Sequence, residues 1–581
     1  MENLTKQAMS RRSFLGGALT TGALIALAAN KPAFAAESSA ADKAADADAE
    51  DIPEVDENKE GAVQGGTLTY YLTNPVGIEP FTTEENQGVE AASNLFDTLV
   101  TWDWGNQRVA PLAAESWEVN DDATVYTFHL RKDAKFHNGD PVTSKDFKYS
   151  WERICRFDYK PAPSSQGTKI AQVKGADEMM AGEATEMEGV ECPDDYTLVV
   201  TLKAPYGDFL LDVTDISTSP IPNGMAATEE EYQKFRLAPI GNGPFMMDGE
   251  WVDGQHIAMK RFEDYWGEKP FIDGVVYQIY ANDQTAWTEF QAGNLDFTSV
   301  PSGQFTLARE MYGEAEGDGF LANPGKQYFT GDELSIFYLL CNNNDEVMGN
   351  VDVRKAISCA VDRQAICDAV FQGTRSPADN VLMPGITAYE PGAWPDCPAQ
   401  KDAAKAGELL DKAGYPAGAD GKRGLSITLS TNSGSSNETL MTMVQADLQA
   451  VGIDATIDVQ EWAAYLDACQ SGNFQMGRMG WVLTAPNAFS VLSDLFQTGF
   501  PNNYSGYANE EFDKAIEAAC QIADDDERNQ AYRDANAIVA EGFPIIPLLY
   551  YTHYYIASAR VHNLFLNPGT VARLNRCWLA Q

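Results

Sequence analysis

The chain has 581 residues and a formal net charge of −44 at pH 7, with 85 acidic and 41 basic side chains. This excess of negative charge repels phosphate backbones and anionic lipid headgroups, so it argues against nucleic-acid binding and against a peripheral membrane protein. The length exceeds the roughly 100 to 200 residues usual for one domain, which predicts two or three domains with large buried cores.

Residues 1–35 have the pattern of a twin-arginine (Tat) export signal. Arg11 and Arg12 are followed by an apolar stretch at residues 17–29 and by small residues at 33–35, where a signal peptidase would cut. The apolar stretch is shorter than the roughly 20 residues that span a bilayer, so we expect cleavage rather than a membrane anchor. No cysteine lies near the cut to carry a lipid. The mature protein is therefore expected in the periplasm or outside the cell, at its surface.

An acidic leader is predicted at residues 36–61. Residues 36–60 contain ten acidic and two basic side chains and few bulky apolar ones. Such a composition cannot bury enough apolar surface to offset the entropy lost on ordering, which predicts disorder.

Three strands are predicted in the first part of the mature chain. Residues 66–72, 126–130 and 196–202 are rich in β-branched and aromatic side chains, and the second segment alternates with period two. The acidic stretch at 179–188 predicts a loop or a short surface helix. We therefore expect a β-rich region with helical insertions.

Helices and strands alternate in the second part of the chain. Apolar residues recur every fourth position from Val353 to Ala369, behind a possible Asp352 cap and ahead of Gly373, which predicts one amphipathic helix. The elements predicted after it are a helix at 401–413, a strand at 425–430, a helix at 438–451, a strand at 453–459, a helix at 461–470 and a strand at 474–481. The last five form a β-α-β-α-β unit, which requires right-handed crossovers and a mostly parallel sheet. Ligands bind beyond the carboxyl ends of such strands, which points to the loop after Trp481.

Sequence motifs for catalysis or metal binding are not found. The five histidines form no H-E-x-x-H pattern, the nine cysteines form no C-x-x-C pair, and no nucleophile elbow, phosphate loop or dinucleotide fingerprint occurs. The many carboxylates leave an acid/base pair open but give it no support. We therefore expect no enzyme activity and no metal. The odd number of cysteines leaves at least one thiol free if pairing is internal, and their connectivity stays open.

Nine sequence blocks carry a family resemblance. They include PIGNGPF and KRFEDYWGEKP, and they lie at residues 94–100, 111–117, 126–154, 239–245, 260–270, 290–297, 351–366, 403–416 and 545–555. In this order they resemble the extracellular solute-binding proteins of family 5, which include the oligopeptide- and dipeptide-binding proteins of ABC importers. The blocks together span nearly the whole mature chain, whereas any one alone would be weak evidence.

The resemblance implies an α/β protein with the type II periplasmic-binding fold, in which two lobes joined by a hinge close on a ligand. By analogy, lobe one comprises residues 62–100, 191–299 and 551–581, the inserted subdomain 101–190, and lobe two 300–550. The family implies a monomer without cofactor or catalysis. By the same resemblance, the protein is expected to capture a peptide or a similarly elongated polar solute and to present it to an ABC permease.

The segment from Arg478 to Trp481 resembles the strand end that lines the ligand cavity in this family. In peptide binders an aspartate typically follows three residues after that tryptophan and pairs with the α-ammonium of the peptide. Here that position is Thr484. Either another acid such as Glu84 supplies the charge, or the ligand lacks a free N-terminus; Glu84 has the alternative of being an exposed loop residue.

Three further side chains are candidates for ligand contact by the same resemblance. Trp481 and Trp462 could form flat walls against which a ligand packs, or they could be core residues. Arg478 could bind a ligand carboxylate in a bidentate manner, or it could pair with one of the many acids.

Polar loop residues complete the candidate set. Asn242 and Gly243, in the loop expected between the lobes, could bind the ligand backbone or simply form a turn, and Asn487 is a candidate of the same kind. Two alternatives for function stay open. The same fold could bind an oligosaccharide or another non-peptide solute, or the protein could be an extracytoplasmic sensor or chaperone.

Overall fold

The computed structural model describes residues 61–580 except residues 84, 157–164, 302, 316–320, 323–325, 434 and 484. The predicted signal with Arg11 and Arg12 lies outside the described residues, as do nearly all of the predicted leader, Glu84 and Thr484. No helix in the described ranges is long and apolar enough to cross a membrane.

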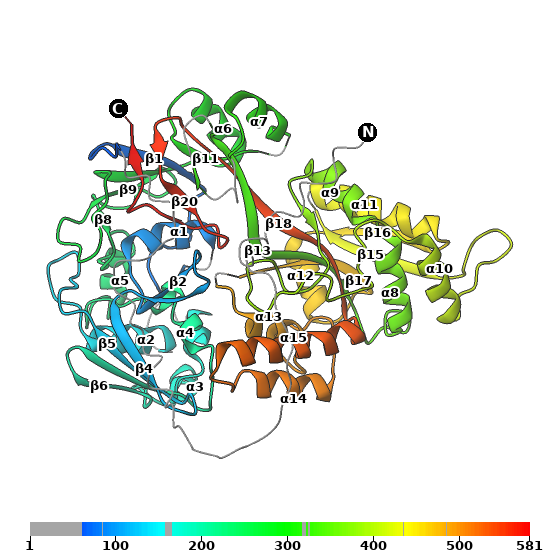
Figure 1. The fold of residues 1–581 in the computed structure, drawn as a ribbon, viewed down its shortest axis with the longest axis horizontal. Coiled ribbons are helices and arrows are strands. Elements are labelled where there is room, and N and C mark those ends of the chain that lie inside the picture. Colours follow the sequence, from blue (N-terminus) through cyan, green and yellow to red (C-terminus); the bar gives the residue numbers. More distant parts are fainter. Residues whose placement is uncertain are drawn as a thin grey trace, which may run out of the picture. The chain divides into compact units, whose positions relative to one another are not determined.

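A mixed sheet of eleven strands organises much of the chain (Figure 1). Its strands follow in the order β16 (Asp454–Gln460), β15 (Ser426–Asn432), β17 (Met476–Val482), β13 (Tyr328–Cys341), β18 (Ile545–Ala557), β11 (Phe297–Ser299), β1 (Thr67–Leu72), β10 (Gly274–Ile279), β9 (His256–Arg261) and β8 (Phe245–Met247), and β14 (Ser376–Pro377) joins at β18. The pairs β16–β15, β15–β17, β11–β1 and β1–β10 are parallel. The other pairs are antiparallel.

The predicted β-α-β-α-β unit is confirmed. Strands β15, β16 and β17 are linked by α11 (Ser435–Ala450) and α12 (Trp462–Gln470), and all three run parallel. We call β16-β15-β17 with its helices and residues 483–544 the C-terminal half of the fold, and β11-β1-β10-β9-β8 with its helices and residues 73–244 the N-terminal half.

Strands β13 and β18 cross between these halves (Figure 1). β13 pairs with β17 from Ser335 to Cys341 and with β18 along most of its length, whereas the last residues of β18 pair with β11. The register of the β13–β18 pair shifts between Asp332 and Ile336, an irregularity that bends strands and increases their twist. The two long strands therefore form the crossing at which the halves are covalently joined.

Helices alternate with the strands along much of the chain. They are α1 (Asn86–Leu95), α2 (Ser144–Cys155), η2 (Ser165–Ile170, a 3-10 helix), α3 (Ala176–Met180), α4 (Phe209–Asp212), η3 (Ile216–Thr218, a 3-10 helix), α5 (Glu229–Phe235), α6 (Asp283–Gln291), α7 (Phe305–Tyr312), α8 (Val351–Ala360), α9 (Arg363–Phe371), α10 (Ala403–Lys412), α13 (Ala488–Phe496), α14 (Glu510–Ala519) and α15 (Asp525–Gly542). The acidic stretch at 179–188 comprises the end of α3 and the turns and bends after it, which agrees with the loop or short helix predicted there.

Smaller sheets complete the fold. A four-stranded antiparallel sheet has the order β4 (Ala114–Val119), β5 (Val125–Leu130), β7 (Thr197–Thr201) and β6 (Val190–Asp194). Two short pairings are β2 (Val100–Asp103) with β3 (Arg108–Pro111) and β19 (Val561–His562) with β22 (Trp578–Leu579). A three-stranded sheet has the order β12 (Leu321–Ala322), β20 (Leu564–Leu566) and β21 (Ala572–Arg573). The predicted strands at 126–130 and 196–202 are thus neighbours in one sheet.

The single helix predicted from Val353 to Ala369 is wrong: two helices, α8 and α9, occupy this stretch. The chain leaves the helical conformation at Val361, and the Asp362 carboxylate accepts a hydrogen bond from the Ala365 amide, which caps the start of α9. The cap of α8 is Asn350 rather than Asp352. The four-residue series does not mark the buried face of α9, because this helix buries Ile366 and Cys367 in the core, whereas Ala369 is exposed.

Two large apolar cores lie under the two halves. One contains residues of β13, β15, β17 and α15, and the other joins β1 and α1 to the four-stranded sheet.

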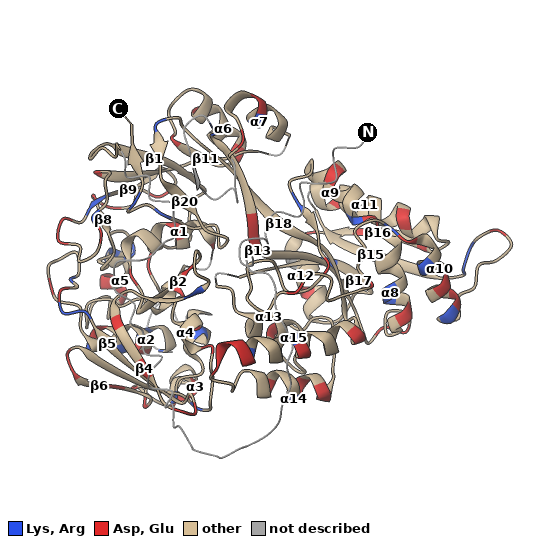
Figure 2. Cartoon of the chain, viewed as in Figure 1, with Lys and Arg blue, Asp and Glu red and all other residues tan. Residues whose placement is uncertain are grey.

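All nine cysteines are free thiols in this structure, and Cys359 and Cys367 are buried. Acidic side chains occur on many elements, with the fewer basic ones scattered among them (Figure 2). The net charge of the whole chain therefore does not predict the local charge of any one site.

Glu90 on α1 is buried and makes the fold sensitive to pH. Its carboxyl accepts hydrogen bonds from the Ala572 amide at 2.7 Å and the Tyr277 hydroxyl at 3.1 Å. Burial nevertheless raises the pKa of Glu90 from 4.5 to about 8. Between these values the folded protein holds one more proton than the unfolded chain, so the free energy of unfolding falls as pH rises, by about 1.4 kcal/mol per pH unit for one such group.

Urea unfolding of the wild type and Glu90→Gln at several pH values between the ordinary pKa of 4.5 and the raised pKa of about 8 tests this expectation. Glutamine mimics the protonated acid, so the variant is expected to lose stability less steeply as pH rises. Equal slopes in both proteins would contradict the assignment of the bound proton to Glu90.

Candidate ligand-binding site

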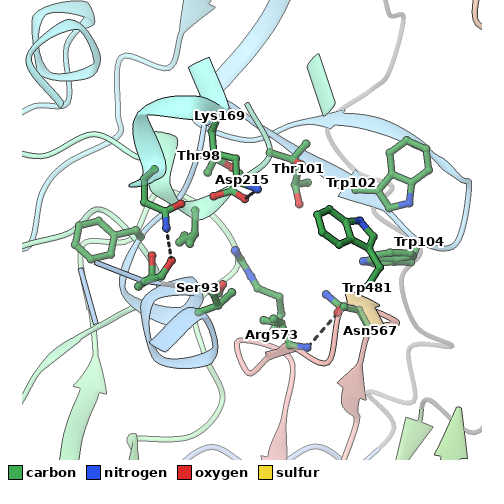
Figure 3. Close-up of a pocket in the computed structure, with 18 of the residues that line it drawn as sticks. Ser93, Thr98, Thr101, Trp102, Trp104, Lys169, Asp215, Trp481, Asn567 and Arg573 are labelled. Carbon is green, nitrogen blue, oxygen red and sulfur yellow. Dashed lines mark hydrogen bonds and ion pairs between the residues drawn. The ribbon is translucent and has the colours of Figure 1, made fainter. Parts of the chain in front are cut away.

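A cavity of about 710 Å³ lies where the two halves of the chain meet (Figure 3). Most of its walls come from the N-terminal half, namely from α1, from β2 and the turn after it, from η2 and from the segment that leads into η3. The C-terminal half contributes Trp481 on β17 and Asn502. The last wall is the segment from Asn567 to Arg573. This volume is in the range of about 300 to 1,000 Å³ that is typical of small-ligand sites.

One charged pair in the cavity wall joins Lys169 on η2 to Asp215. The Lys169 ammonium lies 3.1 Å from the Asp215 carboxylate, which also accepts hydrogen bonds from the amide and hydroxyl of Ser217. Burial acts to raise the pKa of Asp215, but the Lys169 charge and the Ser217 bonds outweigh it and hold the pKa below its usual value. The pair is therefore ionised and neutral as a unit.

A second charged pair joins Arg573 to Asp97. The guanidinium of Arg573 faces the cavity and lies 3.1 Å from the Asp97 carboxylate. Asp97 is fully buried and also accepts hydrogen bonds from the Tyr265 hydroxyl at 2.9 Å and the Trp266 indole at 3.3 Å. Each cation of the described cavity wall is thus matched by its own acid.

Three indoles line one side of the cavity (Figure 3). Trp102 and Trp104 meet edge to face with ring centroids 6.3 Å apart, and Trp481 approaches from β17. The indole nitrogens of Trp102 and Trp481 make no hydrogen bond in this structure. The arrangement provides flat apolar surface together with two buried N–H donors that have no partner.

Known proteins similar to this chain identify its family. A model of the bacterial extracellular solute-binding proteins, family 5, middle part, matches residues 108–503. The chain belongs to family 5 of these solute-binding proteins. It is 30% identical over 490 residues to the periplasmic oligopeptide-binding protein OppA of Haemophilus influenzae, covering 82% of this chain and 87% of that protein. It is 29% identical over 537 residues to the di/tripeptide-binding protein 3 of Pseudomonas aeruginosa, covering 87% and 95%.

Solved structures share the fold of this family 5 chain. The murein tripeptide-binding protein MppA, in its unliganded open form, superposes with a TM-score of 0.75 at 24% identity, covering 89% of this chain and 97% of that one. The protein DppA of Helicobacter pylori, in complex with the peptide STSA, gives a TM-score of 0.69 at 25% identity, covering 90% and 100%. The predicted family and the two-lobed type II periplasmic-binding fold are confirmed.

Among the predicted site residues, Trp481 lines the cavity of this family 5 protein and Arg478 does not. The two lie three positions apart on β17, and because side chains alternate along a strand they point to opposite faces. The Nε of Arg478 donates to the Asn432 amide oxygen at 2.8 Å, and its guanidinium lies 5.4 Å from the ring centroid of Trp462. Trp462 is 46% exposed and lies outside the cavity lining.

The remaining predicted residues hold the backbone near the cavity. The side-chain amide of Asn242 bonds both backbone groups of Asp97, and the Gly243 amide donates to Leu95 at the end of α1. A Cβ at Gly243 would lie 2.6 Å from the Leu95 carbonyl carbon, so only glycine fits this close approach. Neither residue lines the cavity.

Asn487 caps α13 and contacts an acid beside the cavity. Its carbonyl accepts from the Ser490 amide at 3.1 Å and its amino group donates to Asp212 at 3.2 Å. Burial, followed by the nearby Asp208 charge, raises the pKa of Asp212 to about 8. Asn487 therefore links the two halves of the chain beside the cavity rather than lining it.

Five cavity residues, Trp102, Trp104, Lys169, Asp215 and Arg573, were not predicted from the sequence. The two tryptophans directly follow the family block at 94–100, and their spacing of two residues is the signal that could have identified them. The charged residues give no local signal, because each acts with a partner distant in sequence. In the described part of the chain no group of three His, Cys, Asp or Glu side chains is placed to hold a metal ion.

Proposed function

We propose that this family 5 protein is the extracytoplasmic receptor of an ABC importer. It is exported by the Tat route, captures a peptide or a similarly elongated polar solute in the cavity, and presents it as a monomer to a membrane permease. Family members bind solutes without changing them, so the proposed role requires no catalysis.

The cavity is the observation that carries this proposal. It has about 710 Å³ and is lined by residues of both halves, as expected of a site that closes on its ligand. Peptides are the favoured solute because the similar proteins include ones named for oligopeptides, dipeptides and tripeptides. Relatives named for heme and deoxycholate show that the family has other ligands as well.

Closure by a hinge follows from the same proposal. We assign lobe one to residues 62–100, 191–299 and 551–581, the inserted subdomain to 101–190 and lobe two to 300–550. The hinge would lie at the crossing of β13 and β18, where the register shift makes the strands irregular. A ligand that contacts both lobes favours the closed state by its differential affinity for that state.

Ligand identification tests the proposed function. Native mass spectrometry of the protein purified from its own organism is expected to show a bound small molecule, and calorimetry is expected to show binding of di- to pentapeptides but not of cello- or xylo-oligosaccharides. Binding of the sugars alone, or of neither class, would contradict the proposal. N-acetylated peptides are measured as well, since Thr484 has no charge to pair with an α-ammonium. A loss of affinity on acetylation would indicate that an acid such as Glu84 pairs with the α-ammonium of the peptide.

A further inference from the structure

The charges of the described cavity wall are satisfied before any ligand binds. Lys169 pairs with Asp215 and Arg573 pairs with Asp97, each at 3.1 Å. A cationic group placed here would meet two like charges, and the one acid in the lining, Asp215, is already paired. An anionic group would compete with buried acids for the same two cations. Charge complementarity therefore favours an uncharged group in this cavity.

Three polar atoms around the same cavity are buried without a hydrogen-bond partner. They are the indole nitrogens of Trp102 and Trp481 and the hydroxyl oxygen of Thr83. The Trp102 and Thr83 side chains belong to residues that are 9% and 4% exposed. Buried donors without a partner are unfavourable, so a group that supplies acceptors at these positions would be bound selectively.

The shape of the wall adds a second requirement. Trp102, Trp104 and Trp481 present ring faces and edges to one side of the cavity (Figure 3). Flat rings pack on such a wall with large buried area and little loss of conformational freedom. An aliphatic amide or hydroxyl would satisfy the donors but leave the ring faces unfilled.

From these features together we infer that the cavity selects an uncharged ring that carries a hydroxyl group, with the tyrosine side chain of a peptide as its occupant. This inference rests on the proposed function and narrows its substrate class. The phenol ring packs on the indoles, and its oxygen accepts a hydrogen bond from the Trp102 indole N–H. A sugar ring offers the same chemistry from another source.

Calorimetry with a defined peptide set tests the inference. Four alanine tetrapeptides, each with tyrosine at a different position, are compared with the matching phenylalanine, lysine and glutamate sets and with cellotetraose. The best tyrosine peptide is expected to bind at least about tenfold more tightly than its lysine and glutamate counterparts. It is expected to bind about fivefold more tightly than the phenylalanine peptide, which is the effect of one hydrogen bond.

Two variants locate the effect in the cavity. Trp102→Phe removes the N–H donor and keeps a ring, so the ratio of tyrosine to phenylalanine affinity is expected to fall to about one. Trp251→Phe is the matched control, because the indole nitrogen of Trp251 also lacks a partner but lies outside the cavity lining. The ratio is expected to be unchanged in this control, and urea midpoints of both variants verify that they are folded.

The outcomes separate the inference from the proposed function. Tight peptide binding without preference for tyrosine, preference for lysine or glutamate, or an unchanged ratio in Trp102→Phe would overturn the inference and leave the peptide receptor intact. Binding of cellotetraose but of no peptide would keep the ring chemistry and refute the peptide function. Binding of neither would overturn both.

Discussion

Replacing Arg528 by methionine is expected to lower the free energy of unfolding by about 3 to 5 kcal/mol, because it leaves the Asp208 carboxylate buried without its cation. The Nε of Arg528 lies 2.8 Å from Asp208, and the two side chains are 7% and 4% exposed. The Tyr532 hydroxyl also donates to Asp208. Urea unfolding of the wild type and the variant measures the change.

The exposed ion pair of the same guanidinium provides a matched control. Arg528 also pairs with Asp525, whose side chain is 83% exposed. Removal of that charge by Asp525→Asn is expected to cost no more than about 1 kcal/mol, since exposed ion pairs are weak. A double variant, Arg528→Met with Asp208→Asn, should recover part of the loss. A cost below about 1 kcal/mol for Arg528→Met alone would show that water reaches the pair.

Replacing Trp481 by alanine is expected to weaken ligand binding by at least about thirtyfold, the effect of removing a central aromatic contact of about 2 kcal/mol or more. Trp481 is the indole that the C-terminal half contributes to the cavity, so the loss removes contact between ligand and that half. Calorimetry with the best peptide measures the affinity. Trp481→Phe should keep part of it, because the ring remains.

The control for this prediction is Met311→Ala. Met311 on α7 is 56% exposed and does not line the cavity, so its truncation is expected to leave the affinity unchanged. An affinity in Trp481→Ala within about threefold of the wild type would place the ligand elsewhere.

The sequence predicts local structure well where a short pattern determines it. The strands and helices from Ser426 to Val482 follow the predicted order, because alternating apolar residues and terminal glycines act within a few positions. The break between α8 and α9 was missed because it depends on a single cap, Asp362, inside an unbroken apolar period. The family and the fold were predicted from ordered blocks along the whole chain.

The cavity could be predicted only in part. Trp481 was predicted from the resemblance of its segment to the family's cavity-lining strand end, and the β-α-β-α-β unit pointed to the loop that follows it. Arg478, three positions away, points to the other face. Lys169, Asp215 and Arg573 come from segments far apart in sequence, and their pairing depends on how those segments pack. No local sequence pattern indicates such packing. The sequence therefore did not predict that the charged side chains of the site pair and cancel one another.

The contact between Asp208 and Arg528 has a mechanical consequence. It joins the N-terminal half to the C-terminal half at a place separate from the crossing of β13 and β18, and the Gly207 amide reinforces it by donating to the Cys520 carbonyl at 2.8 Å. The Asn487–Asp212 hydrogen bond lies between the same two halves. Separation of the halves on this side of the molecule therefore requires the buried Asp208–Arg528 ions to part, whereas the crossing strands can stay in place.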